Sequence, residues 1–439
     1  MTDRTRAVAK DVLAAVRERD AYANLVLPNL LRQRKLSRRD AALATELAYG
    51  TCRSLGQLDA VIAHCAGRPV DQIDGELLDV LRLGSYQLLR TRIGAHAAVS
   101  TSVDLVGGHK GKAGFVNAVL RRVGKRTLQE WVDELAPTDP IGRLAFEYAH
   151  PKWIAQAFAD ALGSRAGELK DALAADDSRP FVHLVARPGE ISAEELALIT
   201  GGEPGPYSPY AVHLDGGDPG QLELVREGLA AVQDEGSQLV ALALAAAPLD
   251  GPDGMRWLDL CAGPGGKAAL LGALAGIDGG RVDAVEPAEH RAELVRKSTR
   301  DLPVDVHVVD GRASGLAPGY DRVLVDAPCT GLGALRRRPE ARWRRTPDDV
   351  TQLVKLQRDL LGAAIRLVRP GGVVLYSTCS PHLSETSAVV ADAIRRFGVT
   401  PLDTPALLPG VPDVGAGPSA QLWPHRHGTD AMFIAALRK

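Results

Sequence analysis

The sequence predicts a multidomain protein in which an all-α amino-terminal domain precedes a small α/β domain and a larger α/β domain. Apolar residues recur at helical spacing over residues 1 to about 130, which predicts the all-α domain. Short strands are expected at 180–187 and 210–214, around a helix at 192–199. From residue 255 onward, strand runs alternate with helical segments, and this order is typical of a doubly wound parallel sheet.

Length, composition and charge indicate a globular chain with one basic domain. The 439 residues are 45% hydrophobic and 24% charged, which is ordinary for a folded protein. We expect domains at 1–135, 150–235 and 236–439, with a linker at 136–151 that contains three prolines. The net charge of −2 conceals an asymmetry, because residues 1–130 carry 21 Lys and Arg against 13 Asp and Glu. A basic domain favours a polyanionic partner, and a solvated basic surface is an equally weighted alternative.

The cysteines, the histidines and the apolar runs exclude several classes of protein. Five cysteines, an odd number without regular spacing, predict no disulfide framework and a reducing cytoplasm. The longest apolar run, at 239–249, is too short to span a bilayer, and the amino terminus lacks an apolar signal core. His382, His425 and His427 lack the spacing of metal ligands. We therefore expect a cytoplasmic monomer without a membrane or metal partner.

The helices of the first domain are predicted from apolar spacing and from capping residues. Val8 and Val12 recur at helical spacing, and Ser37 is expected to cap a later helix. The last helix of the domain ends in a basic cluster that begins with Arg121 and Arg122. Basic residues at this end complement the helix dipole, and the alternative is that they contact phosphate.

The larger α/β domain is predicted from apolar runs that are separated by turn residues and helical segments. Its strands are expected at 256–260, 281–286, 304–309, 320–326, 372–378 and 432–437. Its helices are expected at 266–275, 288–300, 346–367 and 384–397, with a loop rich in Pro and Gly at 401–424.

A glycine-rich loop follows the first of these strands, and glycines let the backbone pass close to a ligand. A P-loop would need a glycine at Cys261 and a hydroxyl residue at Ala268, and the dinucleotide fingerprint is not met either. A small charged nucleoside therefore remains as the expected ligand. The residues of this loop are Cys261, Ala262, Gly263, Pro264, Gly265, Gly266 and Lys267.

Two acids end the next two strands and complete the predicted cofactor site. Glu286 ends the second strand, where an acid binds ribose hydroxyls in such folds. Asp310 ends the third strand and could accept a hydrogen bond from an adenine amino group. Acids in these places suit a ligand with a cationic centre, such as S-adenosylmethionine, better than a polyphosphate. The weaker alternative is that both acids only cap helices.

Two cysteines and an aspartate follow two further strands of the parallel sheet. Asp326 and Cys329 end the strand at 320–326, and Cys379 ends the strand at 372–378. These groups predict methylation of carbon 5 of a pyrimidine, because a thiolate that adds to carbon 6 makes carbon 5 nucleophilic. Asp326 would stabilise the adduct at the ring nitrogen, and the base must be splayed out of any helix. The residues alone do not say which cysteine attacks, and the alternative is that both are inert buried residues.

Six motifs of the larger domain together resemble the Sun family of RNA 5-methylcytosine methyltransferases. These are DLCAGPGGK, VDAVEP, VVDGR, LVDAPCTGLGALRRRPEARW, LVRPGGVVLYSTCS and HGTDAMFIAAL, of which DAPC and STCS form the specific pair. In the first domain, DVLRLGSYQLLR, AVSTSVDLV and FVNAVLRRV resemble the NusB-type helical RNA-binding domain. The resemblance implies a Rossmann-like catalytic domain that uses S-adenosyl-L-methionine, with 16S ribosomal RNA as the substrate.

The resemblance also implies a role for each site residue. By it, Cys379 is the nucleophile that attacks carbon 6, and Cys329 assists release of the methylated product. Gly263 stands where the family usually has alanine, which adds flexibility, and Ala268 stands where it usually has threonine, which loses a hydroxyl. The cofactor site that the family implies consists of Cys261 through Lys267, Glu286, Asp310 and Asp326.

A run of arginines follows the loop of Cys329. Its place beside a catalytic loop predicts contact with RNA phosphates, with Trp343 packing or stacking on a base. The alternative is a solvated charged surface. Single-stranded or loop RNA is the expected substrate, because its bases can be splayed out. The run consists of Arg336, Arg337, Arg338, Arg342, Arg344 and Arg345, with Trp343 inside it.

Two alternatives from other classes stay open at this point. A DNA cytosine-5 methyltransferase would use the cysteine of a Pro-Cys segment, Cys329, as its nucleophile and would not need Cys379. A non-catalytic RNA-binding ribosome assembly factor would have lost one of the cysteines or acids, and this sequence retains all of them.

Overall fold

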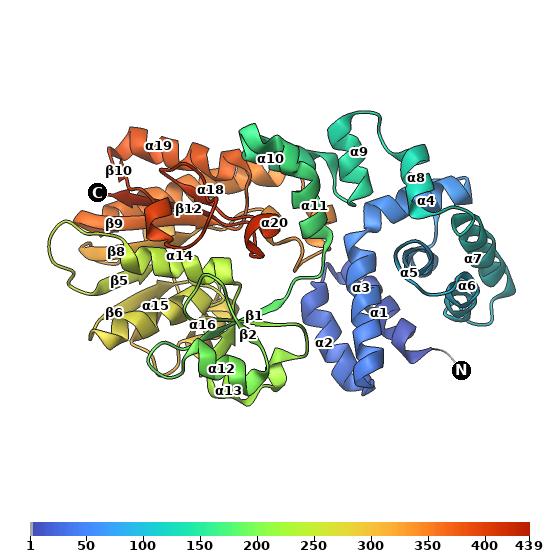
Figure 1. Cartoon of the computed structure of the whole chain (residues 1–439), viewed down its shortest axis with the longest axis horizontal. Helices are drawn as coiled ribbons and strands as arrows, with labels where there is room; N and C mark the ends of the chain where they lie inside the picture. Colours follow the sequence, from blue (N-terminus) through green and yellow to red (C-terminus); the bar gives the residue numbers. More distant parts are fainter. Residues whose placement is uncertain (1–2) are drawn as a thin grey trace. The chain divides into compact units, whose positions relative to one another are not determined.

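The computed structural model describes residues 3–439, which form two compact units (Figure 1). The helical unit contains the chain up to Ser178 together with Leu335–Arg345, and the α/β unit contains Arg179–Ala334 and Thr346–Lys439. The sequence predicted boundaries near 135, 150 and 235 instead. In the two-unit division, the small predicted sheet lies in the α/β unit, whereas the helix predicted after residue 151 lies in the helical unit.

Helices make up the helical unit, as the apolar spacing predicted. They are α1 (Arg4–Arg19), α2 (Ala23–Arg34), α3 (Arg38–Arg53), α4 (Leu55–Ala66), α5 (Gly75–Arg90), α6 (Ala95–Asp104), α7 (Lys110–Val123), α8 (Leu128–Leu135), α9 (Pro140–Glu147), α10 (Lys152–Leu162), α11 (Leu169–Asp177) and α17 (Ala341–Arg344), with 3-10 turns η1 (Val70–Gln72) and η2 (Gly163–Glu168).

The predicted linker at 136–151 is partly wrong, because it contains α9. The Asp139 carboxylate caps this helix by accepting a hydrogen bond of 2.8 Å from the backbone N–H of Gly142. Pro140 lies in the first turn, where a proline loses no intrahelical hydrogen bond. The prolines therefore begin a helix here and do not prevent one.

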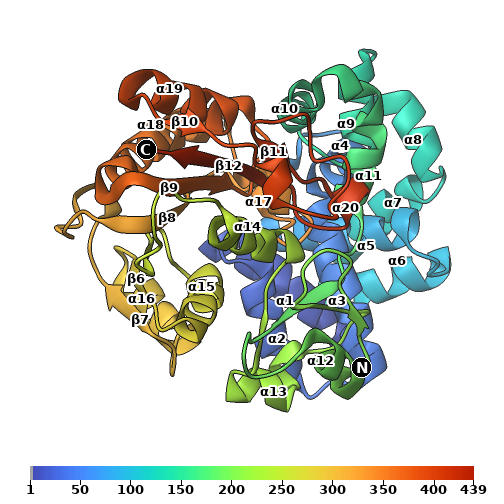
Figure 2. The same cartoon turned by 60° about the vertical axis from the view of Figure 1, so that its left-hand side comes forward.

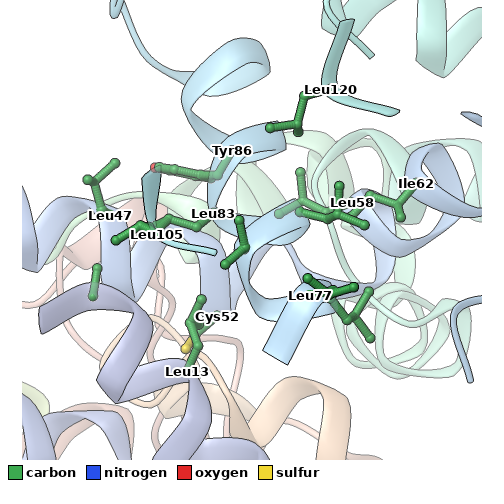
Figure 3. Packing of buried hydrophobic residues seen from close by; sticks show 14 of the residues in the cluster. Leu13, Leu47, Cys52, Leu58, Ile62, Leu77, Leu83, Tyr86, Leu105 and Leu120 are labelled. Carbon is green, nitrogen blue, oxygen red and sulfur yellow. The ribbon is translucent and has the colours of Figure 1, made fainter. Parts of the chain in front are cut away.

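The core of the helical unit forms where the apolar faces of its helices meet (Figure 3). Leu47 of α3, Leu58 of α4 and Leu83 of α5 are fully buried together there. Fully burying one such side chain contributes roughly 1.5–3 kcal/mol. Gly50 is required for this packing, because a Cβ at that position would lie 2.0 Å from the ring of Tyr86.

The segment 335–345 is anchored in the helical unit by a buried ion pair. Arg342 is fully buried, and its Nη2 donates a hydrogen bond of 3.0 Å to the Asp176 carboxylate. The same carboxylate lies 2.9 Å from Nε2 of His150, which is also buried. Arg342 Nη1 donates to the carbonyl of Ala149 at 2.8 Å. A buried arginine without such partners would be strongly destabilising, so this segment depends on Asp176.

Other members of the arginine run also make contacts within the unit, and their predicted contact with RNA phosphates stays a prediction. Trp343 donates from Nε1 to the carbonyl of Arg53 at 3.0 Å, and its ring covers Gly56. Arg344 donates to the carbonyl of Ala21 at 2.6 Å. Arg336 is buried, whereas Arg338 is exposed.

The smaller sheet of the α/β unit is antiparallel, with strand order β2-β3-β1-β4. It confirms the predicted strands and the helix between them. The elements are β1 (Val182–Ala186), α12 (Ala193–Thr200), β2 (Glu203–Pro204), β3 (Ala211–Leu214), η3 (Pro219–Gln221), α13 (Glu223–Glu227) and β4 (Ala230–Val232), followed by α14 (Glu235–Ala246).

The larger sheet has the predicted doubly wound order, β10-β12-β9-β8-β5-β6-β7, with β11 paired to β12. Strands β5 to β9 are parallel, and β12 is antiparallel to β9. Its strands are β5 (Arg256–Asp259), β6 (Arg281–Val285), β7 (Val304–His307), β8 (Tyr320–Asp326), β9 (Val368–Thr378), β10 (Thr400–Pro401), β11 (Ala420–Gln421) and β12 (Phe433–Arg438). The helices are α15 (Gly266–Ile277), α16 (Glu289–Ser298), α18 (Pro347–Leu367), α19 (Ser387–Phe397) and α20 (Pro424–His427), with 3-10 turns η4 (Gly311–Ala313), η5 (Leu332–Ala334), η6 (Leu383–Glu385) and η7 (Pro405–Leu407).

Helices cover both faces of the larger sheet, α14 and α15 on one and α18 and α19 on the other (Figures 1 and 2). Successive residues of a strand point to opposite faces, so each central strand contributes to both cores. Leu324 packs in the core of α14 and α15, while its neighbours Val323 and Val325 pack in the core of α18 and α19. This explains why the central strands are continuous apolar runs.

Across residues 3–439, no helix combines the length and the apolar character needed to cross a membrane.

We expect Arg342→Met to lower the stability of the helical unit by about 3–5 kcal/mol, because it removes the cation that compensates the buried Asp176 carboxylate. Urea unfolding monitored by tryptophan fluorescence measures this change. Arg338→Met, in the same segment but exposed, is the matched control and should stay within about 0.5 kcal/mol of the unmodified protein. Equal unfolding midpoints for the two variants would contradict the anchoring role of Arg342.

Candidate active site

The candidate site lies where three neighbouring parallel strands end. Asp259 ends β5, Asp326 ends β8, and Cys379 follows β9. The chain runs outward from β5 to β6 and β7, and then returns to β8 on the opposite side of β5. Ligands bind outside the carboxyl ends of strands at such a reversal of strand order.

The glycine-rich loop connects β5 to α15 and fits closely against α16. Gly265 has φ = 114°, which residues with side chains rarely adopt, and a Cβ there would lie 3.0 Å from Cα of Val295. Gly265 immediately precedes α15, so the first backbone N–H groups of that helix have no partner within it. The loop therefore packs tightly against α16 and offers backbone hydrogen-bond donors to a ligand.

Gly263 leaves room for the acid at the end of β6. A Cβ at this position would lie 2.1 Å from Oε2 of Glu286. Arg291 of α16 donates from Nη2 to the Gly263 carbonyl at 2.7 Å, and its Nε lies 3.4 Å from the Glu286 carboxylate. Glycine in place of the alanine usual in the resembling family thus has a specific steric reason in this chain. The carboxylate that was expected to bind ribose is buried beside the glycine loop.

The second predicted cofactor acid, Asp310, caps the 3-10 turn η4. It accepts a hydrogen bond of 2.9 Å from the backbone N–H of Arg312 and pairs with the guanidinium of the same residue. Hydrogen bonding from Arg312 lowers the pKa of the Asp310 carboxyl, which is therefore ionised at neutral pH. The contacts shown are those of a cap, and adenine binding by Asp310 stays a prediction.

Asp259 is a candidate site residue that the sequence argument did not select. Its Oδ1 accepts a hydrogen bond of 3.2 Å from the backbone N–H of Cys261, whereas its Oδ2 is buried without a hydrogen-bond partner. Burial, together with the nearby charge of Asp326, raises the pKa of Asp259 to about 7. The signal was present in the sequence, because an acid at the end of the first strand faces the same edge as Glu286.

Asp326 is paired with the lysine of the glycine loop. Lys267 Nζ donates to Asp326 Oδ2 at 2.8 Å, and the Ser377 hydroxyl donates to Oδ1 at 2.9 Å. Burial acts to lower the pKa of Lys267, but the charge and hydrogen bond of Asp326 outweigh it, so the pKa is raised overall. A fixed cation thus lies at the edge that carries the second cysteine.

The two predicted cysteines are in direct contact. The Sγ atoms of Cys329 and Cys379 lie 3.4 Å apart, and the backbone N–H of Gly333 donates to the Cys379 carbonyl at 2.9 Å. The hydrogen bond with Cys379, followed by burial, holds the pKa of the Cys329 thiol well above its ordinary value. Cys329 is therefore a protonated thiol at neutral pH, and a thiol is a weaker nucleophile than a thiolate.

The two basic residues predicted at the end of α7 belong to the helical unit and not to this cluster. Arg121 is exposed and donates to the side chain of Asn117 at 3.1 Å. Arg122 is also exposed and donates to the carbonyl of Cys65 at 2.8 Å. Their contact with RNA stays a prediction.

The site combines groups that fit S-adenosylmethionine better than a metal ion. The Oδ2 atom of Asp259 is an unsatisfied buried acceptor beside the glycine loop, and a positively charged ligand would satisfy it. Gly265 lets the loop pack against α16, since a Cβ there would lie 3.0 Å from Cα of Val295, and it directly precedes the first backbone N–H groups of α15. Among residues 3–439, no cluster of three or more His, Cys, Asp or Glu side chains has the arrangement of a metal site.

Comparison with family models assigns both parts of the chain. Residues 246–438 match the model of the 16S rRNA methyltransferase RsmB/F, and residues 3–125 match that of the NusB family. Members of the RsmB/F family use S-adenosyl-L-methionine as the methyl donor. The amino-terminal match confirms the NusB-like helical domain that the sequence predicted.

Similarity to individual proteins covers the whole chain. A methyltransferase of Mycobacterium tuberculosis is 63% identical over 100% of this chain and 97% of its own length. The probable ribosomal RNA small subunit methyltransferase B of Bacillus subtilis is 31% identical, over 99% of this chain and 98% of its own length.

Solved structures share the fold of this chain. One crystal structure, at 23% sequence identity, covers 100% of both chains with a TM-score of 0.81. A methyltransferase homolog from Pyrococcus horikoshii, also at 23% identity, covers 69% of this chain and 99% of its own with a TM-score of 0.55. The family models and the full-length relatives lead to one conclusion: this chain belongs to the RsmB/F family of ribosomal RNA methyltransferases.

Proposed function

We propose that this methyltransferase methylates carbon 5 of a cytosine in 16S ribosomal RNA through a covalent adduct with Cys379. The observation that carries the proposal is the 3.4 Å contact between the Sγ atoms of Cys329 and Cys379, beside Asp326 and Lys267. Methylation of a pyrimidine carbon requires a nucleophile at carbon 6 and a second group that helps the nucleophile to leave. Two adjacent thiols at the end of a cofactor-binding sheet supply both.

Cys379 is the better candidate for the nucleophile. Its neighbour Cys329 is held as a thiol, because the hydrogen bond with Cys379 and burial keep the Cys329 pKa well above its ordinary value, and a thiol is a weaker nucleophile than a thiolate. These interactions agree with the role that the resemblance implied for each thiol.

The reaction would proceed in two covalent steps. The Cys379 thiolate bonds to carbon 6, which moves an electron pair onto the ring nitrogen. That nitrogen takes up a proton from water, and the Asp326 carboxylate stabilises the adduct by accepting a hydrogen bond from the resulting N–H. S-adenosylmethionine supplies the methyl group that carbon 5 takes up. Transfer of the carbon-5 proton to a base then lets the sulfur–carbon bond break, with the Cys329 thiol beside the departing sulfur.

The cofactor would be held by the loop Cys261–Lys267, with Glu286 on the ribose and Asp310 on the adenine. Glu286 supports this role because its carboxylate is buried directly against Gly263. Asp259 would face the cationic part of the cofactor, since its free Oδ2 lies beside the same loop.

RNA contact is proposed for the exposed basic residues of the helical unit. The Arg338 guanidinium lies 5.9 Å from the ring centroid of Tyr22, which is itself 40% exposed. An aromatic ring with an arginine beside it can stack on a base and contact its phosphate. The exposed Arg121 and Arg122 would add charge, in accord with the NusB family match, and the half-buried Arg337 would do so from the segment beside Arg338. Trp343 and Arg344 also hydrogen-bond to the carbonyls of Arg53 and Ala21 within the unit, and their contact with RNA stays a prediction.

The two alternatives from other classes are weaker. A DNA enzyme with Cys329 as nucleophile would need a thiolate where the structure favours a thiol, and the family acts on RNA. A non-catalytic assembly factor conflicts with membership in a methyltransferase family. The free cysteines and an rRNA substrate fit a cytoplasmic enzyme.

We expect the affinity for S-adenosylmethionine to rise as the pH increases through the Asp259 pKa of about 7. The sulfonium charge favours the ionised carboxylate, so below this pKa the Asp259 carboxyl must release its proton when the cofactor binds. This release costs free energy at low pH. The cost disappears as the carboxyl of the free protein ionises, so the affinity rises with pH. Isothermal calorimetry at several pH values, in buffers of different ionisation heat, measures the released proton. Asp259→Asn should remove this part of the pH dependence, and S-adenosylhomocysteine, which lacks the sulfonium charge, should show less of it. Identical pH profiles for the unmodified protein and Asp259→Asn would contradict this assignment.

We expect the two cysteine variants to fail in different ways. Cys379→Ala lacks the nucleophile, so neither an enzyme–RNA adduct nor methylated product should form. Cys329→Ala retains the attack but releases product slowly, so an adduct that survives denaturing gel electrophoresis should accumulate with RNA and cofactor. Cys65→Ala, in the helical unit, is the control and should turn over without a stable adduct.

The opposite pattern, an adduct with Cys379→Ala and none with Cys329→Ala, would reverse the two roles. Activity in both variants without any adduct would rule out covalent catalysis. Methyl transfer to matched RNA and DNA oligonucleotides, with cytosine or 5-methylcytosine at one position, tests the substrate and the methylated carbon separately.

A further inference from the structure

Glu385 is a buried carboxylate that the mechanism above does not use. It ends the 3-10 turn η6, six residues after Cys379, and its side chain is 0% exposed. A carboxylate in such a place needs hydrogen-bond donors to compensate the loss of water. The donors to Glu385 therefore show which segments the carboxylate connects.

The donors to Glu385 come from the residues that directly follow the two catalytic cysteines. Thr330, next to Cys329, donates its backbone N–H to Oε1 at 2.9 Å and its hydroxyl to Oε2 at 2.5 Å. Ser380, next to Cys379, donates its hydroxyl to Oε2 at 2.6 Å. One carboxylate thus connects the loop after β8 with the loop after β9.

Two further contacts fix the carboxylate and the cysteine loops to the frame of the domain. Gln357 of α18 donates from Nε2 to Glu385 Oε1 at 3.0 Å and to the carbonyl of Pro328 at 2.9 Å. The residues on both sides of Cys329 are therefore held by this network. The Tyr376 hydroxyl of β9 donates to the backbone carbonyl of Glu385 at 2.7 Å.

A purely structural role explains this arrangement poorly. An apolar side chain of similar size would fill the same buried space without the cost of desolvating a charge. The carboxylate accepts four hydrogen bonds, the full capacity of its two oxygens. Three of the four come from the two residues that follow the cysteines. The four hydrogen bonds therefore constrain the position of one cysteine loop relative to the other.

We propose that Glu385 is a positioning residue that keeps Cys329 and Cys379 side by side. This inference rests on the proposed covalent mechanism, in which Cys329 must lie next to the sulfur that departs. Without the carboxylate, the two loops would still be joined by the backbone bond from Gly333 to the Cys379 carbonyl and by the contact of 3.3 Å between the Thr330 and Ser380 hydroxyls. The residues next to the two cysteines would lose their common acceptor, and the contact between the two sulfurs would be lost for part of the time.

Phenylarsine oxide measures the proximity of the thiols without RNA or cofactor. Its arsenic atom bonds to two thiol sulfurs and its oxygen leaves as water with both thiol protons, so tight binding requires the two sulfurs to be adjacent. We expect Glu385→Gln to bind the arsenical about tenfold more weakly, because the amide cannot accept all four hydrogen bonds. Cys329→Ala gives the background from the other cysteines.

Glu235→Gln is the matched control. Glu235 is also 0% exposed, in the same unit, and accepts backbone hydrogen bonds from Tyr207 and Ser208, but it does not contact either cysteine loop. We expect its arsenical affinity to equal that of the unmodified protein. Equal affinities for Glu385→Gln and the unmodified protein, with Glu385→Gln folded by circular dichroism, would overturn the proposal.

Kinetics separate positioning from general destabilisation. Glu385→Gln should lower kcat and leave more adduct on denaturing gels, while KM for RNA and Kd for S-adenosylmethionine stay unchanged. Parallel losses in all of these quantities would indicate a structural role and overturn the proposal. Failure of the covalent mechanism would show as turnover by Cys379→Ala. The arsenical affinity of Glu385→Gln is measured without turnover, so it tests the positioning role separately.

Thr330→Val provides a second test if Glu385→Gln does not fold. This change removes the hydroxyl donor and retains the backbone donor and the side-chain shape. We expect weaker arsenical binding in the same direction and to a smaller extent, and an unchanged affinity in the folded variant would overturn the proposal.

Discussion

The chemistry of this protein depends on the parallel pairing of β8 and β9. In that register Asp326 lies opposite Ser377, and the two are joined by a hydrogen bond of 2.9 Å. Cys329 follows Asp326 by three residues, and Cys379 follows Ser377 by two, so both thiols emerge at the same edge. A shift of one residue would turn each strand residue toward the opposite face and would separate the acid, the lysine and the thiols.

Several carboxylates lie close together at the carboxyl ends of these parallel strands, where they are partly or fully buried. Asp326 is compensated by Lys267, Glu286 by Arg291, and Glu385 by four hydrogen bonds. Asp259 differs, since one of its oxygens is buried without a partner. An unsatisfied acceptor is costly in an apolar setting, and it persists where a ligand completes it. The unsatisfied oxygen of Asp259 is therefore suited to a cationic ligand, while the other three carboxylates are held by their partners.

Arginine serves two purposes in the segment 335–345, which follows the loop of Cys329. Arg342 stabilises the helical unit from its interior through Asp176, whereas Arg338 stays at the surface beside Tyr22. Composition cannot separate these uses, because a guanidinium pairs equally well with a buried carboxylate and with a phosphate. The net charge of a domain thus predicts the class of its partner better than it predicts which residues contact that partner.

The sequence alone predicted the class of each domain and the order of the main strands and helices of the larger sheet, and it selected candidate site residues at the strand ends. Continuous apolar runs such as 320–326 predicted the buried strands, because both faces of a central parallel strand are covered by helices. It also placed Glu286, Asp326, Cys329 and Cys379 at strand ends, where polar residues follow apolar ones. These signals are local, because they depend only on residues that are neighbours in the sequence.

Only the tertiary structure decided which of these residues touch. The 3.4 Å contact of the thiols, the open oxygen of Asp259 and the bridge through Glu385 arise from segments that are far apart in the chain. The burial of Arg342 and the helix within the predicted linker were likewise beyond local patterns. Hydrogen bonds and desolvation depend on distances of a few tenths of an ångström between non-consecutive residues. Spacing along a sequence does not contain those distances.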